Sequence, residues 1–422
     1  MLFASSHLTA RISLALCLLP FLLSRTSFSQ ESTQSRLQWV GSWAASQQLV
    51  EPQNAIPTNL RDVTLRQIVH LSLGGNQIRL RLSNRFGTAA LHFSRVHVAA
   101  PVVATSDKIV PGTDKPITFL GATDVTIPAH ADYLSDAIAY PLNALSNLAI
   151  TLHLDAVPSD QTGHPGSRAT SYFAPGDRVS APELPQKQSI DHWYFIAGVD
   201  VLASPDTASV VVLGDSITDG HGATTNGNDR WTDVLAQRLQ SEPSTRKLAV
   251  LNHGIGGNRV LTDSLGPNAL SRFDHDVIAQ PGIRDLIVLE GINDLGMLTR
   301  IEDVSRSEHD ALVRGMMAAY QQMIVRAHDH GIKVIGATIM PFSGSSFYHP
   351  GPLNEADRQA INEWIRAAGH FDAVIDFDKL TRDPQHPDRL LPAFDSGDHL
   401  HPSPAGYAAM GNAVPLSLFM TW

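Results

Sequence analysis

The spacing of the hydrophobic residues changes once along this chain, close to residues 204–206. Before that point, apolar and polar side chains alternate in short runs such as residues 78–82, a pattern typical of strands with one buried face. After it, unbroken apolar runs such as residues 210–213 alternate with helical patterns, as in strands that are buried on both faces. We therefore expect two different kinds of sheet in this chain.

Residues 37–203 are expected to form an all-β, sandwich-like accessory domain. Two alternating runs, residues 65–73 and 78–82, flank a Gly-Gly-Asn sequence at 74–76, which favours a hairpin. Proline and glycine separate the strand candidates, and no long helical pattern interrupts them, which favours a sandwich or a barrel-like domain. The further strand candidates are residues 91–99, 117–120 and 148–154.

Residues 208–422 have a different pattern, in which strands alternate with helices. We expect helices at residues 307–330 and 354–368, the second one capped by Asn354 and ended by Gly369. A series of this kind predicts a parallel sheet with helices on both faces. The strand candidates are residues 210–213, 248–251, 286–289, 334–339 and 374–377.

The first 29 residues have the features of a secretory signal peptide. Arg11 precedes a mainly apolar run at residues 12–23, which is too short to span a bilayer comfortably. Small residues then favour cleavage between Ser29 and Gln30. We therefore expect a secreted or periplasmic protein, and a retained membrane anchor is the alternative.

The cysteine content limits the chemistry of the mature chain. The one cysteine, Cys17, lies inside the predicted signal peptide, which excludes a disulfide framework, a multi-thiolate zinc site and a thiol nucleophile. A formal net charge of −10 argues against a nucleic-acid partner, because such binding needs a basic face. No stretch after residue 29 has the length of a membrane span, and nothing in the sequence indicates a particular oligomeric state.

Polar and glycine residues follow the strand candidates at the ends where a parallel sheet gathers its functional groups. A purely structural turn would not need such residues at each of these ends, so we expect one shared site. The blocks are Gly-Asp-Ser-Ile at 214–217, Gly-Ile-Gly-Gly-Asn at 254–258, Gly-Ile-Asn-Asp at 291–294 and Asp-His-Leu-His at 398–401.

In this order, the four blocks resemble those of the SGNH (GDSL-type) esterase and acylhydrolase superfamily. They extend over residues 213–402, roughly half of the expected mature chain. The resemblance implies a flavodoxin-like, three-layer parallel sheet and an enzyme that hydrolyses carboxylic esters. No phosphate loop or spaced dinucleotide fingerprint is present, so no cofactor is expected.

Three residues of the first and last blocks are expected to form a catalytic triad. Ser216 is a poor nucleophile by itself and needs a base within hydrogen-bond reach. The resemblance assigns that role to His401, and Asp398 lies three residues earlier, where it can orient the imidazole. Taken alone, each of these residues also fits a structural role, and Ser216 would suit a helix cap.

The oxyanion hole is expected to use donors from three blocks. The tetrahedral intermediate develops negative charge that must face preorganised N–H groups. The backbone N–H groups of Ser216 and Gly257 and the side-chain amide of Asn293 are the candidates, and Gly256 fits the glycine requirement equally well.

Residues close to the nucleophile are candidates for substrate binding, namely Asp219, Asn258 and Arg259. A β domain ahead of the hydrolase resembles the layout of secreted carbohydrate esterases in that superfamily. We therefore expect the partner to be an acylated carbohydrate or another small ester, with a short and most simply an acetyl group. A lipase or lysophospholipase is the first alternative, and a non-catalytic carbohydrate-binding or scaffold protein is the second.

A metal site at the last block is a further alternative. Asp398, His399 and His401 carry ligand atoms, and residues two apart can share one face of a strand. No second cluster of matching ligands stands out in the sequence, so we favour the triad and expect no metal.

Overall fold

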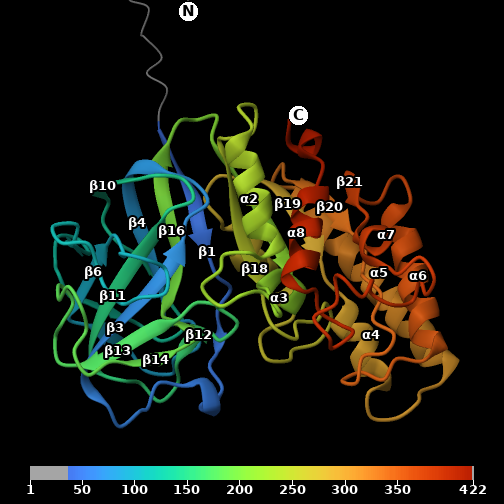
Figure 1. Cartoon of the computed structure of the whole chain (residues 1–422), viewed down its shortest axis with the longest axis horizontal. Helices are drawn as coiled ribbons and strands as arrows, with labels where there is room; N and C mark the ends of the chain where they lie inside the picture. The colour runs from blue at the N-terminus through green and yellow to red at the C-terminus, as the bar shows by residue number, and fades with distance from the viewer. Residues whose placement is uncertain (1–36, 421–422) are drawn as a thin grey trace, which may run out of the picture. The chain divides into compact units, whose positions relative to one another are not determined.

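Two systems of strands make up the body of the computed structural model, which describes residues 37–420 (Figure 1). The predicted signal peptide and its cleavage site lie outside the described residues, so both stay predictions. Residues 37–203 contain antiparallel sheets, and a parallel sheet begins at residue 208. The division into two domains at this point also remains a prediction.

Two antiparallel sheets dominate the N-terminal half. The first sheet has the order β1 (Gln38–Ala44), β16 (Ile196–Ala203), β4 (Gly75–Ser83), β10 (Ile138–Leu142), and β9 (Asp132–Leu134) also pairs with β4. The second has the order β14 (Gln188–Ile190), β13 (Ser171–Pro175), β3 (Arg61–His70), β11 (Asn147–Ala156), β6 (Arg95–Ala99), β7 (Lys115–Ile117). Two smaller sheets are β15 (Trp193–Tyr194), β12 (Thr162–His164), β2 (Gln48–Leu49), and β5 (Leu91–Phe93), β8 (Val125–Ile127).

The two larger sheets share one hydrophobic core. Leu80 of β4 and Leu152 of β11 are both fully buried in it, although their strands belong to different sheets. Packing of two antiparallel sheets around a common core is what the period-two pattern predicts. The expectation of an all-β N-terminal region is confirmed.

The predicted hairpin between residues 65–73 and 78–82 is wrong. β3 pairs with β11 and β13, whereas β4 pairs with strands of the other sheet. A side chain on Gly74 would lie 2.6 Å from the carbonyl oxygen of Leu142, so this glycine serves a close approach between chain segments. The chain therefore crosses from one sheet to the other at this point.

The parallel sheet has the order β18 (Leu248–Gly254), β17 (Ala208–Gly214), β19 (Ile283–Leu289), β20 (Lys333–Ala337), β21 (Ala373–Ile375). In order of sequence this is 2-1-3-4-5, the arrangement of flavodoxin-like folds. All of its strand pairs are parallel. The expected flavodoxin-like architecture is confirmed.

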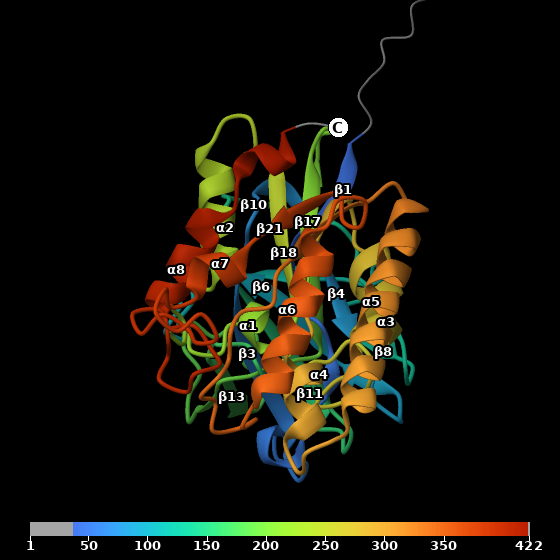
Figure 2. The ribbon, with the colours of Figure 1, turned by 90° about the vertical axis from the view of Figure 1, so that its right-hand side faces the viewer.

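Helices cover both faces of this sheet, with α2 and α8 on one side and α3 and α5 on the other (Figure 2). The helix expected at 354–368 begins at Pro352, and Asn354 is not its cap but accepts a hydrogen bond from the N–H of Gly351. No helix within residues 37–420 is long and apolar enough to cross a membrane. The helices are α1 (Ser216–Asp219), α2 (Trp231–Ser241), α3 (Ala269–Phe273), α4 (Ile292–Thr299), α5 (Arg306–His328), α6 (Pro352–Arg366), α7 (Phe377–Thr381) and α8 (Pro404–Ala413), with short turns η1 (Pro52–Asn54), η2 (Asp274–Ile278) and η3 (Leu416–Phe419).

The N-terminal half covers an edge of the parallel sheet. β18 is an edge strand, and the N–H of Val250 donates a hydrogen bond of 2.9 Å to Ser72 Oγ. A side chain on Gly41 of β1 would lie 2.7 Å from a methyl group of the buried Leu251, so the glycine leaves room for this side chain where β1 packs against β18. An exposed strand edge would invite pairing with other chains, and the N-terminal half prevents this at β18.

Candidate active site

The first block places Ser216 at the start of a short helix that follows the central strand β17. Asp215 caps this helix, because its Oδ1 accepts a hydrogen bond of 2.9 Å from the N–H of Ile217. A side chain on Gly214 would lie 2.2 Å from Thr218 Oγ1, so the glycine lets α1 fold back against the strand end. Gly220, with φ of +103°, ends the helix.

The structure brings the three predicted triad residues together. Ser216 Oγ lies 2.8 Å from His401 Nε2, and His401 Nδ1 lies 2.6 Å from Asp398 Oδ2. The other carboxylate oxygen of Asp398 accepts hydrogen bonds from the backbone N–H groups of Leu400 and His401. Burial opposes ionisation of Asp398, but the hydrogen bonds from His401 outweigh it and hold its pKa well below the usual range. The arrangement leaves His401 Nε2 as the acceptor for the serine proton.

A second histidine, which the sequence reasoning missed, lies against the triad. The rings of His221 and His401 are 4.0 Å apart between centroids, and Arg168 donates a hydrogen bond of 3.0 Å to His221 Nδ1. Partial burial, together with the nearby imidazole of His401 and the guanidinium of Arg168, lowers the pKa of His221 to about 4. His221 is therefore neutral near pH 7 and adds no positive charge beside His401.

Two of the predicted oxyanion donors line the same cavity as Ser216, namely Gly257 and Asn293, and so does Gly256. The Asn293 amide is held from both ends. Its Nδ2 donates a hydrogen bond of 2.7 Å to the carbonyl of Asn258, and its Oδ1 accepts one of 2.5 Å from the hydroxyl of Tyr348. One N–H of this amide remains for a ligand.

Tyr348 comes from the loop that follows β20, and it lies in none of the four sequence blocks. It is buried, and its ring lies against Gly296 of α4, where a side chain would come within 2.3 Å of the ring. Since only a glycine leaves room for the ring, α4 and this loop fix the tyrosine hydroxyl on Asn293.

The site opens into a cavity of about 430 Å³, within the usual range of roughly 300–1,000 Å³ for small-molecule sites. Besides the triad and the oxyanion candidates, it is lined by His221, Phe347 and Tyr348. Part of its wall comes from the N-terminal half, namely Gln48, Glu51, Asn54, Pro165, Gly166 and Arg168. No pattern in the sequence connects these six residues with the four blocks.

The three candidates for substrate binding differ in position. Asp219 lines the cavity, but its Oδ1 lies 2.8 Å from His164 Nε2. Asn258 is buried, and its side chain bonds to the carbonyl of Pro267 and to Arg272. Arg259 donates to the carbonyl of Asp263, and neither it nor Asn258 lines the cavity. The substrate-binding role of all three residues stays a prediction. Asp219 is the best candidate, because it is the one of the three that lines the cavity.

Within residues 37–420, one group of side chains could hold a metal ion, namely His221, Asp398 and His401. Their ligand atoms all lie within 4.8 Å of one another. Both ring nitrogens of His401 already face protein groups, namely Asp398 and Ser216. His399, the other candidate ligand in the sequence, lies 2.5 Å from Asp395 Oδ2 through its Nδ1 and has no part in this cluster.

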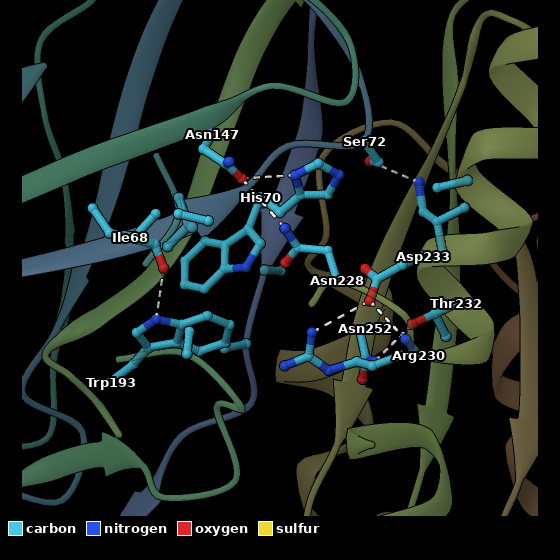
Figure 3. A pocket seen from close by; sticks show the side chains of 18 of the residues that line it. Ile68, His70, Ser72, Asn147, Trp193, Asn228, Arg230, Thr232, Asp233 and Asn252 are labelled. Carbon is cyan, nitrogen blue, oxygen red and sulfur yellow. Dashed lines mark hydrogen bonds and ion pairs between the residues drawn. The ribbon is translucent and has the colours of Figure 1, made fainter. Parts of the chain in front are cut away.

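A smaller cavity of about 50 Å³ lies between the N-terminal half and α2 (Figure 3). Its polar side chains bond mainly to one another, as His70 does to Asn147 and Asn252 to Thr232. At roughly 10–15 Å³ for each water centre, this volume suits a few water molecules and is too small for a substrate. The larger cavity is therefore the candidate site.

Buried carboxyl groups lie under the site, and the guanidinium of Arg272 acts on two of them, Asp215 and Glu290. Burial raises the pKa of Asp215 to about 7 and that of Asp294 to about 6, and it raises the pKa of Glu290 well above its usual value. Arg272 donates hydrogen bonds to Glu290 and to Asp276. The charge on this arginine partly compensates a cluster that resists full ionisation.

We expect Asp215→Asn to change how stability depends on pH. Because the folded pKa of about 7 exceeds the unfolded value of about 3.9, the native state binds the extra proton, and this stabilisation is lost as pH rises towards 7. The wild type should therefore lose thermal stability between pH 5 and pH 8.5 relative to the variant, in melting curves recorded at each pH. Asp303→Asn, at an exposed position, is the matched control. Parallel curves for Asp215→Asn and the wild type would contradict this expectation.

Comparison with known proteins gives one family. Residues 212–409 match the model of the GDSL-like lipase/acylhydrolase family. No curated protein matches the chain.

A comparison of structures also matches about half of this chain with several solved structures. These include a GDSL-like lipase from Bacteroides thetaiotaomicron (18% identity, 50% of this chain and 87% of that chain, TM-score 0.36) and a carbohydrate acetylesterase from Sinorhizobium meliloti (16%, 50% and 99%, 0.37). A catalytic mutant of an acetylxylan esterase from Geobacillus stearothermophilus is a third (19%, 49% and 91%, 0.37).

Proposed function

We propose, for a chain whose residues 212–409 belong to the GDSL-like lipase/acylhydrolase family, that it is a serine esterase for short acyl groups, most simply acetyl groups, on carbohydrate hydroxyls. Membership of that family agrees with the resemblance of the four sequence blocks. The match to this family also supports the conclusion that the protein is a hydrolase. The substrate and the roles of single residues are our proposal.

The observation that carries the proposal is the unbroken series of contacts from Asp398 through His401 to Ser216. As Ser216 Oγ attacks the ester carbonyl carbon, its proton moves to His401 Nε2. The tetrahedral intermediate then breaks its bond to the alkoxy oxygen, and this oxygen takes the proton from His401 and leaves as an alcohol. A water molecule attacks the acyl-enzyme through the same base and releases the carboxylic acid and the free serine.

The oxyanion is assigned to the N–H groups of Ser216 and Gly257 and to the free N–H of Asn293. The contacts that fix the amide of Asn293 support this assignment, because a preorganised donor needs no reorientation when the charge develops. Gly256 remains the alternative to Gly257, since both glycines line the cavity.

The chemistry of the cavity supports a carbohydrate ester. Amide and carboxylate side chains, namely Gln48, Glu51 and Asn54, line one part of it and suit hydroxyl groups. Phe347 and Leu265 add exposed apolar side chains to the lining, and apolar surface exceeds polar surface in the cavity as a whole. A lipase or lysophospholipase is the second candidate, because Leu265 and Leu400 also reach the cavity. A purely carbohydrate-binding role would not need a bonded Ser216 and His401.

Ser216→Ala should abolish hydrolysis of p-nitrophenyl acetate, because, of the serines among the described residues that line the cavity, only Ser216 is hydrogen-bonded to a histidine that can act as its base. Spectrophotometric release of p-nitrophenol measures this, and EDTA should leave the wild-type rate unchanged. Residual turnover of Ser216→Ala near the wild-type rate would rule out the mechanism, and loss of activity in EDTA would favour the metal alternative.

The wild type should deacylate acetylated xylan faster than it hydrolyses lysophosphatidylcholine. The reason is that the amide and carboxylate side chains of Gln48, Glu51 and Asn54 line one part of the cavity and suit the hydroxyl groups of a sugar. Release of acetate and of fatty acid, each measured as kcat/KM, makes the comparison. A clear preference for the lipid would favour the second candidate.

Tyr348→Phe should lower kcat on the order of tenfold with little change in KM. The variant loses one hydrogen bond, about 1–1.5 kcal/mol, that holds the Asn293 amide for the transition state. Asn293→Ala should cost more, on the order of 10²–10³, because it removes the donor itself. Tyr172→Phe removes a hydroxyl that bonds to the carbonyl of Thr105 and serves as the control. An equal loss in both tyrosine variants would mean that Tyr348 acts only through the fold.

A further inference from the structure

Two segments of the N-terminal half form part of the active-site wall. One runs from β2 to η1 and contributes Gln48, Glu51 and Asn54. The other, residues 165–168, connects β12 with β13 and contributes Pro165, Gly166 and Arg168. Both segments therefore face a substrate that Ser216 would attack.

Buried contacts fix residues 164–168 to the helix that carries the nucleophile. His164 Nε2 lies 2.8 Å from Asp219 Oδ1, and both side chains are buried. Arg230 donates one hydrogen bond to the carbonyl of Asp219 and another to the carbonyl of Ser167. At Gly166, a side chain would overlap the carboxylate of Asp219 at 1.7 Å. The segment thus lies directly against α1, and its distance from Ser216 is set by packing.

The other segment presents a carboxylate that has no cationic partner within residues 37–420. Only neutral amides hold Glu51: Asn54 Nδ2 donates to its Oε2 at 3.1 Å, and Gln48 Nε2 lies 3.4 Å from its Oε1. Gln48 also donates to the carbonyl of Leu265, which ties the segment to the loop after β18. Glu51 is half-buried, so its orientation is fixed while its remaining acceptor sites face the cavity.

An acyl group has no hydrogen to donate to a carboxylate, whereas the alcohol part of a sugar ester has several hydroxyls. A carboxylate can accept two of them at once, and such charged hydrogen bonds are stronger than neutral ones. Its charge also disfavours an anionic alcohol, such as a uronate or a phosphate-bearing headgroup. Arg168, the cation of the wall, already donates to His221.

We propose that Glu51, oriented by Asn54 and Gln48, binds hydroxyl groups of the alcohol part of the ester. In this way the N-terminal half supplies the subsite for the alcohol that leaves during the reaction. This subsite selects neutral alcohols with several hydroxyl groups. This inference rests on the proposed esterase function and adds to it the part of the chain that recognises the alcohol.

The test compares wild type and Glu51→Gln on an acetylated neutral xylo-oligosaccharide and on p-nitrophenyl acetate, whose alcohol has no further hydroxyl. Glu51→Gln keeps the shape of the side chain and removes its charge. We expect kcat/KM on the oligosaccharide to fall about tenfold or more, mainly through KM, since a hydrogen bond to a charged group is worth about that factor. On p-nitrophenyl acetate, kcat/KM of the same variant should change less than twofold. Glu302→Gln, at an exposed position far along the chain, is the matched control.

A third substrate, an acetylated uronate oligosaccharide, tests the role of charge. Glu51→Gln should reduce the preference of the wild type for the neutral sugar over the uronate, again about tenfold. An equal loss on all three substrates, or no loss on the neutral sugar, would overturn the proposal. The proposal would also be overturned if the wild type cleaved p-nitrophenyl acetate in a Ser216-dependent way but did not cleave the sugar. In that case the serine esterase chemistry would stand, and the carbohydrate substrate would not. A wild type without any Ser216-dependent activity would instead contradict the proposed function itself.

Discussion

One buried guanidinium connects the ends of three parallel strands. Arg272 donates to the carbonyl of Gly214 at the end of β17, to the carbonyl of His253 in β18, and to Glu290 just after β19. It also donates to Ser46 Oγ of the N-terminal half. A buried charge is costly unless it is paired and fully hydrogen-bonded, so these contacts must form together. The platform under the site therefore depends on a cation that several elements share.

The side chains of the site come from elements of different rigidity. Ser216 and Asn293 stand on helices that begin where strands end, whereas Asp398 and His401 lie in a loop. Backbone hydrogen bonds to Asp398 hold that loop in place, and His399 takes a left-handed conformation, with φ of 59°, between the two functional residues. The strand ends and one strongly bonded loop together fix the geometry that the proposed nucleophilic attack needs.

The sequence allowed the parallel sheet, its strand ends and the triad candidates to be predicted, because all of these leave local patterns. Contacts between distant segments leave none: Arg168 and His221 are far apart in the chain, and so are Asn293 and Tyr348. The hairpin failed for the same reason, since Gly74 serves a close approach to Leu142 and not a turn between paired strands. The one trace of the Tyr348 contact in the sequence is the glycine at position 296, because the absence of a side chain there makes room for the tyrosine ring.

The close packing of Gly166 against Asp219 also bears on how substrate would enter and leave. Residues 164–168 pack directly against α1, so an outward swing of this segment as a lid would break the buried contact between His164 and Asp219. This part of the cavity wall is thus already assembled in the free protein. Little binding energy is then spent on ordering this part of the wall.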